Sequence, residues 1–93
     1  MTDRVIYTKA AAVGLDAAAG WLTQPGSGFR AHNKLDDLHA SIERLPEDYD
    51  LYAKDPDVPN CRLAVIHGYA VRYRRRKDGA VVVLRVFGPG QRR

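Results

Sequence analysis

The amino-acid sequence predicts an α+β domain, a two-layer sandwich with the element order β-α-α-β-β-β, in which a helical hairpin packs on one face of a mainly antiparallel sheet. The chain has 93 residues, the length of one domain, and we expect a single domain over residues 1–93. Apolar residues recur at helical spacing in the first half and with a period of two after residue 60. Helices that precede a run of strands are typical of the α+β class.

The N-terminal segment predicts a short strand followed by a helix. Arg4–Tyr7 is β-branched and aromatic, as strands are. Thr8 is a suitable N-cap for an alanine-rich helix over Lys9–Leu22. The helix is expected to bury a stripe of residues at helical spacing, Leu15, Ala18, Ala19 and Leu22. Trp21 lies beside this stripe, and we expect it to pack as well.

A second helix is expected after the Pro-Gly-Ser-Gly break at residues 25–28. Ser27 is predicted to cap it, and it should run to about Leu45, where Pro46 ends it. Its apolar seam follows a spacing of three and four residues and consists of Leu35, Leu38, Ile42 and Leu45. The two helices then form an αα-hairpin. Residues 46–60 are acidic, contain three prolines and are interpreted as a surface loop.

Three strands follow as a meander, over Cys61–Ile66, Tyr69–Arg75 and Ala80–Phe87. His67-Gly68 is expected to turn the chain between the first two strands. Lys77–Gly79 is expected to form a tight hairpin, because Asp-Gly accepts the positive φ that such turns need. Both tyrosines of the middle strand are expected to face the helices.

The charged residues divide the chain into an acidic middle and a basic end. Eight acids lie between residues 35 and 57, whereas from residue 62 onward nine Lys and Arg accompany one acid, Asp78. On the middle strand Arg72 and Arg74 alternate with apolar residues, so one sheet face is expected to be apolar and the other open and basic. A basic face attracts a polyanion or an acidic protein, although arginines also form solvated sheet edges.

Several classes of function are excluded by what the sequence lacks. Cys61 is the single cysteine, so an intrachain disulfide and a multi-cysteine metal cluster are excluded. We see no signal peptide and no apolar run long enough to span a bilayer, which together with the lone cysteine indicates a cytoplasmic protein without a membrane partner. The histidines lack further ligands at metal-binding spacing. We therefore expect no metal, no cofactor and no stable small-molecule ligand.

Two stretches of the chain resemble the RelE/ParE superfamily of bacterial type II toxins. They are VIYTKAAAVGLDAAAGWL at the start and the meander HGYAVRYRRRKDGAVVVLRVFGPGQ. In the family a Gly-Tyr pair opens the middle strand, a V-x-Y alternation follows, and a charged turn with Asp-Gly precedes a V-x-V-L-x-V strand. The matching residues here are Gly68-Tyr69, Val71–Tyr73, Lys77–Gly79 and Val82–Val86. The resemblance covers nearly the whole chain.

The superfamily has two functional branches, and the residues present here are closer to the ParE branch. RelE-like members are ribosome-dependent endoribonucleases, which need a base, an acid and cations around the phosphate. At the corresponding positions this chain has Arg62 but also Ala64, Ala70 and the segment Gly88–Gln91, with no Tyr or His near the end. ParE-like members act on DNA gyrase without catalysis, so the resemblance implies a toxin with no catalytic residues.

The ParE resemblance implies two binding sites. A ParD-like antitoxin, whose C-terminal segment carries an amphipathic helix and acids, is expected on the open sheet groove at Arg62, Arg72, Arg74, Val83, Arg85 and Phe87. By strand parity Val83, Arg85 and Phe87 share one side, so exposed apolar groups are expected to flank the arginine. DNA gyrase is the expected target, bound by Arg85, Phe87, Gly88, Gln91, Arg92 and Arg93.

Two alternatives remain open from the sequence. One is a ribosome-dependent mRNA endoribonuclease of the RelE type, with chemistry carried by Arg62, His67, Arg72 and Arg85. The other is a general nucleic-acid-binding module, which is disfavoured because no pair of stacking aromatic residues is evident on the basic face.

Overall fold

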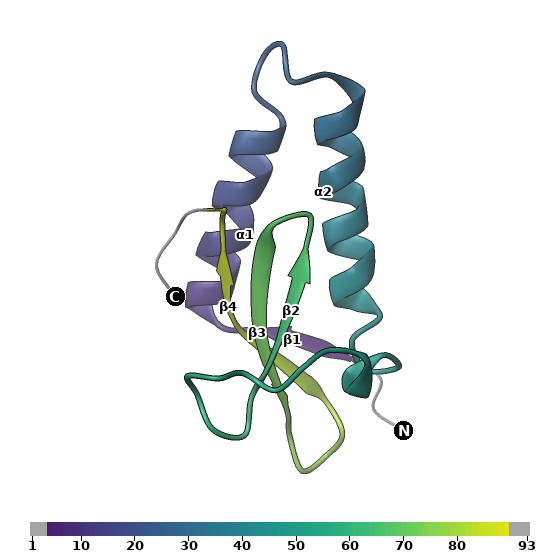
Figure 1. The fold of residues 1–93 in the computed structure, drawn as a ribbon, viewed down its shortest axis with the longest axis vertical. Helices are drawn as coiled ribbons and strands as arrows, with labels where there is room; N and C mark the ends of the chain where they lie inside the picture. The colour runs from purple at the N-terminus through teal and green to yellow at the C-terminus, as the bar shows by residue number, and fades with distance from the viewer. Residues whose placement is uncertain (1–3, 90–93) are drawn as a thin grey trace.

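A computed structural model describes residues 4–89 of the chain. Its elements are, in order, β1 (Val5–Tyr7), α1 (Lys9–Leu22), α2 (Gly28–Glu43), the 3₁₀ helix η1 (Tyr49–Leu51), β2 (Arg62–Ile66), β3 (Tyr69–Arg75) and β4 (Val81–Phe87). The strands form one sheet in the order β1-β4-β3-β2, with β1 parallel to β4 and the other pairs antiparallel. Figure 1 shows the two helices side by side over the strands. The predicted fold class and element order are confirmed.

The two helix starts differ in how they are capped. Thr8 accepts a hydrogen bond from the backbone N–H of Ala11 at 3.1 Å, so the predicted cap of α1 is confirmed. The Thr8 hydroxyl also donates to the carbonyl of Leu84 at 2.7 Å, which ties the start of α1 to β4. Ser27 makes no capping bond and already has helical dihedral angles, so its predicted role is wrong. The helix itself ends at Glu43, two residues before the predicted boundary.

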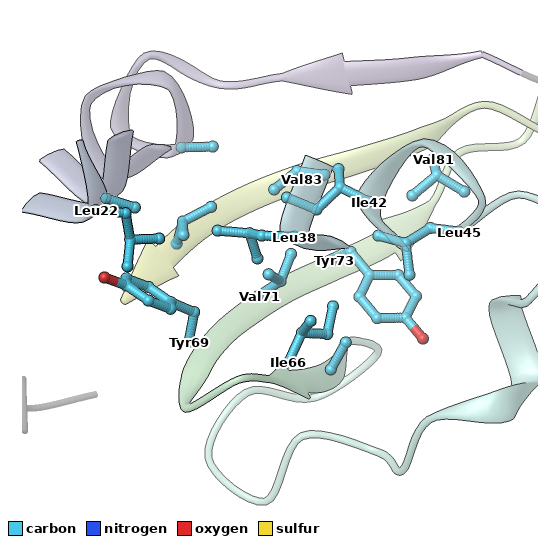
Figure 2. Packing of buried hydrophobic residues seen from close by; sticks show 14 residues of the cluster. Leu22, Leu38, Ile42, Leu45, Ile66, Tyr69, Val71, Tyr73, Val81 and Val83 are labelled. Carbon is cyan, nitrogen blue, oxygen red and sulfur yellow. The ribbon is translucent and has the colours of Figure 1, made fainter. Parts of the chain in front are cut away.

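The hydrophobic core lies between the helices and one face of the sheet (Figure 2). Leu38, Ile42 and Leu45 are fully buried, which confirms most of the predicted seam, whereas Leu35 is only partly buried. From β3 and β4, the core receives Tyr69, Val71, Tyr73, Val81, Val83 and Val86, and β2 adds Ala64 and Ile66. The two tyrosines of β3 therefore face the helices as predicted.

Gly14 allows α1 to lie directly against β4. A Cβ atom at this position would stand 2.3 Å from the carbonyl oxygen of Val86, closer than any side chain tolerates. The same helix buries Ala11, Ala18 and Leu22 but leaves Trp21 64% exposed. The expectation that this tryptophan packs in the core is therefore wrong.

A β-bulge in β4 changes which residues share a face. Arg72 pairs with Arg85, but the next residue of β3, Tyr73, pairs with Val83, so Leu84 is the extra residue. The bulge inverts the parity of β4, and Val83 lies in the core with no exposed surface while Arg85 points to the other side. The prediction that Val83, Arg85 and Phe87 share one exposed side of β4 is therefore wrong.

The segment between α2 and β2 covers part of the sheet. The ring of Tyr49 packs edge-on against Tyr73 at 5.4 Å, and the hydroxyl of Tyr73 donates to the carbonyl of Tyr49 at 2.8 Å. Further along, the backbone N–H of Asp55 donates to the carbonyl of Cys61 at 2.9 Å, and the backbone N–H of Leu63 donates to the carbonyl of Ala53 at 3.0 Å. The predicted surface loop is therefore a packed segment that pairs with the start of β2.

Candidate binding surface

The outer sheet face is the side of the sheet that points away from the helices. It is formed by alternate residues of β3 and their partners on β4, namely Ala70, Arg72, Arg74, Val82, Arg85 and Phe87. The residues between them on β3 belong to the core, so Arg72, Arg74 and Arg85 all point away from the helices. The alternation predicted for β3 is confirmed.

Arg72 is held by a buried ion pair instead of facing solvent. Its Nε donates to a carboxylate oxygen of Asp55 at 2.6 Å, and the Asp55 side chain has no exposed surface. Burial opposes ionisation of this carboxyl group. Hydrogen bonds from Arg72 and from the backbone N–H groups of Asp57 and Val58 outweigh that effect and lower the pKa of Asp55. Arg72 thus anchors the acidic segment to the outer sheet face.

Phe87 forms the floor of this face. The residue is 2% exposed, and two guanidinium groups lie over its ring, with the Cζ of Arg72 at 5.2 Å and that of Arg85 at 4.7 Å from the ring centroid. Cation–π contacts at such distances orient a guanidinium group without neutralising its charge. Phe87 therefore positions Arg85 and does not itself present an open aromatic surface.

Arg74 and Arg85 are the cations that this face leaves available. Both are exposed, and neither forms an ion pair with any residue between 4 and 89. Arg72 and Arg85 are register partners across β3 and β4, and Arg74 follows on β3 opposite Val82. The two unpaired guanidinium groups can each donate charge-assisted hydrogen bonds to an acidic ligand.

Arg62 was expected in the same groove as Arg72 and Arg74, but it lies on the opposite side of the sheet. Its register partner is Tyr73, a core residue. The guanidinium group donates to the carbonyl of Tyr52 at 2.7 Å, pairs with Asp50 at 3.2 Å and stands over the ring of Tyr49 at 5.3 Å. These contacts hold the acidic segment in place. The prediction of a single surface that contains Arg62, Arg72 and Arg74 is therefore wrong.

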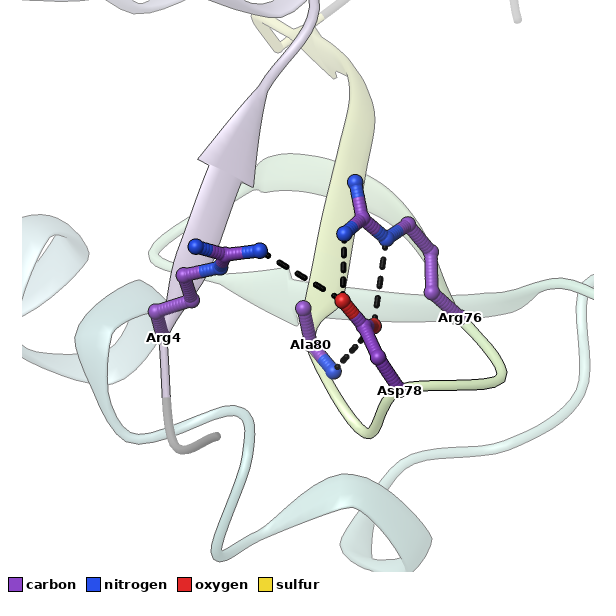
Figure 3. A network of polar contacts seen from close by, with 4 residues as sticks. All are labelled: Arg4, Arg76, Asp78 and Ala80. Carbon is purple, nitrogen blue, oxygen red and sulfur yellow. Dashed lines mark hydrogen bonds and ion pairs between the residues drawn. The ribbon is translucent and has the colours of Figure 1, made fainter. Parts of the chain in front are cut away.

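Asp78 neutralises part of the positive charge of the β3–β4 hairpin (Figure 3). This carboxylate pairs with Arg76, which donates through both Nε and Nη2, and with Arg4 at 3.4 Å. It also accepts the backbone N–H of Ala80 at 3.1 Å. The hydrogen bond from Arg76 is the main reason that the pKa of Asp78 is lowered to about 2. The predicted tight turn is present, with Gly79 at a φ of 91°.

Arg75 is also used within the fold. It donates to the carbonyl of Pro46 at 2.8 Å, and its guanidinium group stands over the ring of Tyr49 at 4.4 Å from the centroid. Most arginines of the hairpin are therefore held by internal acceptors or rings. The surface available to a partner is smaller than the charge of the segment suggests.

The groups considered for catalysis do not converge. His67 lies in the β2–β3 turn at a φ of 50° and pairs through Nε2 with Asp37 of α2 at 2.8 Å, so it serves as a polar turn residue. Cys61 is buried, and burial raises the pKa of its thiol. Ala64 and Ala70, which stand where the nuclease branch has cations, are buried. Within residues 4–89 no cluster of His, Cys, Asp or Glu could hold a metal ion.

The structure brings only part of the predicted sites together. Arg74, Arg85 and Phe87 share the outer sheet face, with Gly88 directly after the end of β4. Gln91, Arg92 and Arg93 lie outside the described residues. Asp55 was missed as the partner of Arg72, although its position in an acidic segment before the basic strands was an available signal. Within the described part, no helix is long and apolar enough to cross a membrane.

Comparisons with known proteins agree with this architecture. The family model described as "ParE toxin of type II toxin-antitoxin system, parDE" matches residues 5–92. Among solved structures, a chain of the "Chromosomal ParDE TA system from P. aeruginosa" superposes with a TM-score of 0.70 at 20% sequence identity, over 92% of this chain and 95% of that chain. No curated protein matches the sequence significantly.

The chain is a small α+β domain in which a helical hairpin packs on a four-stranded mixed sheet, the same fold as that ParDE-system chain. Because the family model matches nearly the whole chain, the chain belongs to the ParE toxin family of type II toxin–antitoxin systems.

Proposed function

We propose that this ParE-family toxin inhibits DNA gyrase by binding it without catalysis, and that a ParD-like antitoxin neutralises it. The observation that carries the proposal is the outer sheet face, where Arg74 and Arg85 are exposed and have no ion-pair partner among the described residues. Unpaired cations on a rigid sheet suit a binding surface, because their hydrogen bonds are free for a partner. Action on gyrase would occur in the cytoplasm.

The proposal of a non-catalytic toxin rests on the dispersal of the reactive groups. Cleavage of RNA by its own 2′-OH needs a base, an acid and cations around one phosphate. Here Arg62 stacks near the acidic segment, His67 pairs with α2, and Arg85 lies on the outer sheet face. Two further positions that carry cations in the nuclease branch are Ala64 and Ala70. Alanine neither transfers a proton nor stabilises a phosphate.

The antitoxin segment that fits this surface is acidic. Carboxylates can reach Arg74 and Arg85, whereas Arg72 is already paired with Asp55 and contributes by holding Phe87 in position. A charge-assisted hydrogen bond contributes about 1.5–3 kcal/mol. Two such contacts are enough to give the acidic segment a defined register on β3 and β4.

For the target, we propose contacts from the end of β4 and the residues that follow it. Arg85 and Gly88 lie at this end of the sheet, and Gln91, Arg92 and Arg93 continue the chain. These residues would contact gyrase when the antitoxin is absent. A toxin of this kind stabilises the complex of gyrase with cut DNA, so damage to DNA is the expected consequence.

The test is a gyrase cleavage assay with purified full-length toxin and plasmid DNA. The toxin should increase the fraction of linearised plasmid, and Arg85→Glu or deletion of residues 91–93 should remove most of that increase. Lys34→Glu is a matched control, because Lys34 is an exposed cation that lies on α2 and not on the sheet. If neither change at the end of β4 alters the increase, gyrase is contacted elsewhere; if the toxin produces no increase, the gyrase proposal fails.

A second assay separates this proposal from RNA cleavage. Toxin added to translating ribosomes should leave messenger RNA at full length, because the chain lacks the cations and proton-transfer groups of the nuclease branch. Primer extension across the message would detect cuts. Codon-dependent cleavage that Arg72→Ala abolished would replace the gyrase proposal with an RNase activity.

A further inference from the structure

Three arginines stand at alternate positions of β3 and the turn that follows it, and the chain pairs the first and the third of them. Nε of Arg72 donates to Asp55 at 2.6 Å. Arg76 donates to Asp78 through both Nε and Nη2 (Figure 3). The middle arginine, Arg74, is exposed and forms no ion pair with any residue between 4 and 89. Aspartates of the chain itself therefore interrupt this row of cations on both sides of Arg74.

The two aspartates reach the row from different segments. Asp55 belongs to the acidic segment before β2, and its side chain has no exposed surface. It also accepts the backbone N–H groups of Asp57 and Val58 at 2.8 Å and 3.2 Å. Asp78 lies in the β3–β4 turn, and its side chain is 41% exposed. Exposed ion pairs contribute little to stability, so the pair between Arg76 and Asp78 acts mainly on the charge that the surface presents.

Nucleic acid and an acidic protein segment make different demands on a basic surface. Phosphates follow one another without a break, and each phosphate that a protein neutralises makes the slope of log K against log[salt] more negative by about 0.7 for a single strand. A carboxylate of a protein segment can be held separately by one guanidinium group. Arg85 pairs with Arg72 in the register, which makes Arg74 its diagonal neighbour, with the two Cα atoms roughly 7–8 Å apart. Two separated cations of this kind suit carboxylates better than a continuous row of phosphates.

Phe87, the aromatic residue of the outer sheet face, offers no open ring on which a base could stack. The residue is 2% exposed, and the guanidinium groups of Arg72 and Arg85 lie over its ring. Proteins that bind single strands without sequence preference combine a basic groove with stacking on aromatic side chains. Affinity for nucleic acid at this face would therefore come from cations, and the number of unpaired cations decides its strength.

We propose that Asp55 and Asp78 determine the specificity of the outer sheet face by keeping nucleic acid from binding there. They neutralise the arginines on either side of Arg74 and leave two separate cations, Arg74 and Arg85, for carboxylates. A chain with a net charge of +4 attracts polyanions of every kind, and this arrangement favours acidic protein segments among them. The role of the two cations in holding a protein partner rests on the proposed function, whereas the exclusion of nucleic acid does not depend on it.

Asp78→Asn is the decisive variant, because it frees Arg76 and keeps a side-chain oxygen that can accept the backbone N–H of Ala80. Binding of a labelled RNA of about 20 uridines should be measured by fluorescence anisotropy from about 20 mM to about 200 mM salt. We expect the affinity at the lowest salt to rise roughly two- to fivefold above that of the wild type. The slope of log K against log[salt] should become more negative by about 0.7, because one more phosphate is neutralised.

Asp57→Asn is the matched control. It changes the net charge of the chain by the same amount, but Asp57 is exposed and forms no ion pair with any residue of the described part. This variant should bind the RNA as the wild type does. The inference is wrong if Asp78→Asn binds the RNA no more tightly than Asp57→Asn, because the net charge alone then decides.

Two further variants locate the effect on the outer sheet face. Asp55→Asn frees Arg72, whose side chain is only 11% exposed, so it should give a smaller gain than Asp78→Asn. Circular dichroism should show that this variant keeps the fold; if it does not fold, the comparison of Asp78→Asn with Asp57→Asn decides alone. A folded Asp55→Asn variant with no gain overturns the part assigned to Asp55.

Arg74→Gln added to Asp78→Asn should remove most of the gain, because the freed Arg76 then has no unpaired cation two positions before it. If the gain persists, the RNA binds elsewhere and the inference is wrong. These results are separate from the gyrase cleavage assay. A chain that does not increase linearised plasmid can still show the gain in RNA binding, and a chain that does increase it can still lack the gain.

Discussion

The two faces of the sheet use their side chains in different ways. On the face covered by the helices, Tyr73 and Val83 pack against Leu38 and Ile42, and all four have no exposed surface. On the outer sheet face, Arg74 and Arg85 are exposed and lack ion-pair partners within the described residues. The first face supplies the stability of the fold, whereas the second presents groups whose partners lie outside the chain.

The arginines of the basic end divide in the same way. Arg72 is held by Asp55 and Arg76 by Asp78, while Arg75 donates to a backbone carbonyl. Buried or internally paired cations have little left to offer a ligand, because their donors are occupied. The number of arginines in this segment therefore overstates its capacity for binding. The relevant quantity is the number of cations that the fold leaves unpaired.

Leu38→Ala should give the largest loss of stability. This side chain is fully buried between α2 and the sheet, and truncation of a core leucine costs about 2–5 kcal/mol. The free energy of unfolding can be measured by urea denaturation. Leu51→Ala is a matched control, because Leu51 is 70% exposed, and it should change the midpoint only slightly. Equal midpoints for the two variants would contradict the assignment of the core.

Asp55→Ala should have the next largest effect. It leaves the buried guanidinium group of Arg72 without its partner, and breaking a buried pair costs about 3 kcal/mol when the remaining charge can turn partly toward water. Asp57→Ala removes a neighbouring exposed acid and should be nearly neutral. If urea denaturation shows the same stability for both variants, the outer sheet face does not depend on this pair.

The ion pair between Arg72 and Asp55 should also make the free energy of unfolding depend on pH, an effect smaller than that of the two substitutions above. The pKa of Asp55 in the folded state is lowered, and its unfolded value is about 4. The contribution of the pair is therefore complete above pH 4 and is lost as the pH falls from there toward the folded-state pKa. Unfolding free energies measured between pH 7 and pH 3 should fall less steeply for Asp55→Asn than for the wild type. Parallel curves would contradict a native ion pair at this position.

Much of the fold could be predicted because its signals are local. The spacing of Leu38, Ile42 and Leu45 identified α2, and Thr8 marked the start of α1. Alternation along β3 correctly separated the arginines from the core residues. Each of these patterns depends on residues that are neighbours along one helix or strand, where backbone geometry alone decides the side that a residue faces.

The features that sequence reasoning missed depend on contacts between distant segments. The bulge at Leu84 moved Val83 into the core, and no residue in that apolar strand signals where the register changes. Arg72 meets Asp55 only because the segment before β2 folds back over the sheet. Trp21 was expected to pack because it lies beside the predicted stripe of α1, but Leu22 enters the core whereas Trp21 is exposed. Strand register, ion pairing and burial at these positions are determined by tertiary packing.

Arg74 and Arg85 are expected to serve binding and to contribute little to the stability of the fold. Isothermal titration of antitoxin into Arg74→Glu/Arg85→Glu, compared with Lys34→Glu, tests this claim directly. Loss of two charge-assisted contacts should weaken binding by on the order of 10²–10⁴-fold, while the free energy of unfolding changes by less than about 1 kcal/mol. Wild-type affinity in the double variant, with Lys34→Glu unchanged, would contradict the claim and leave these arginines as a solvated edge of the sheet.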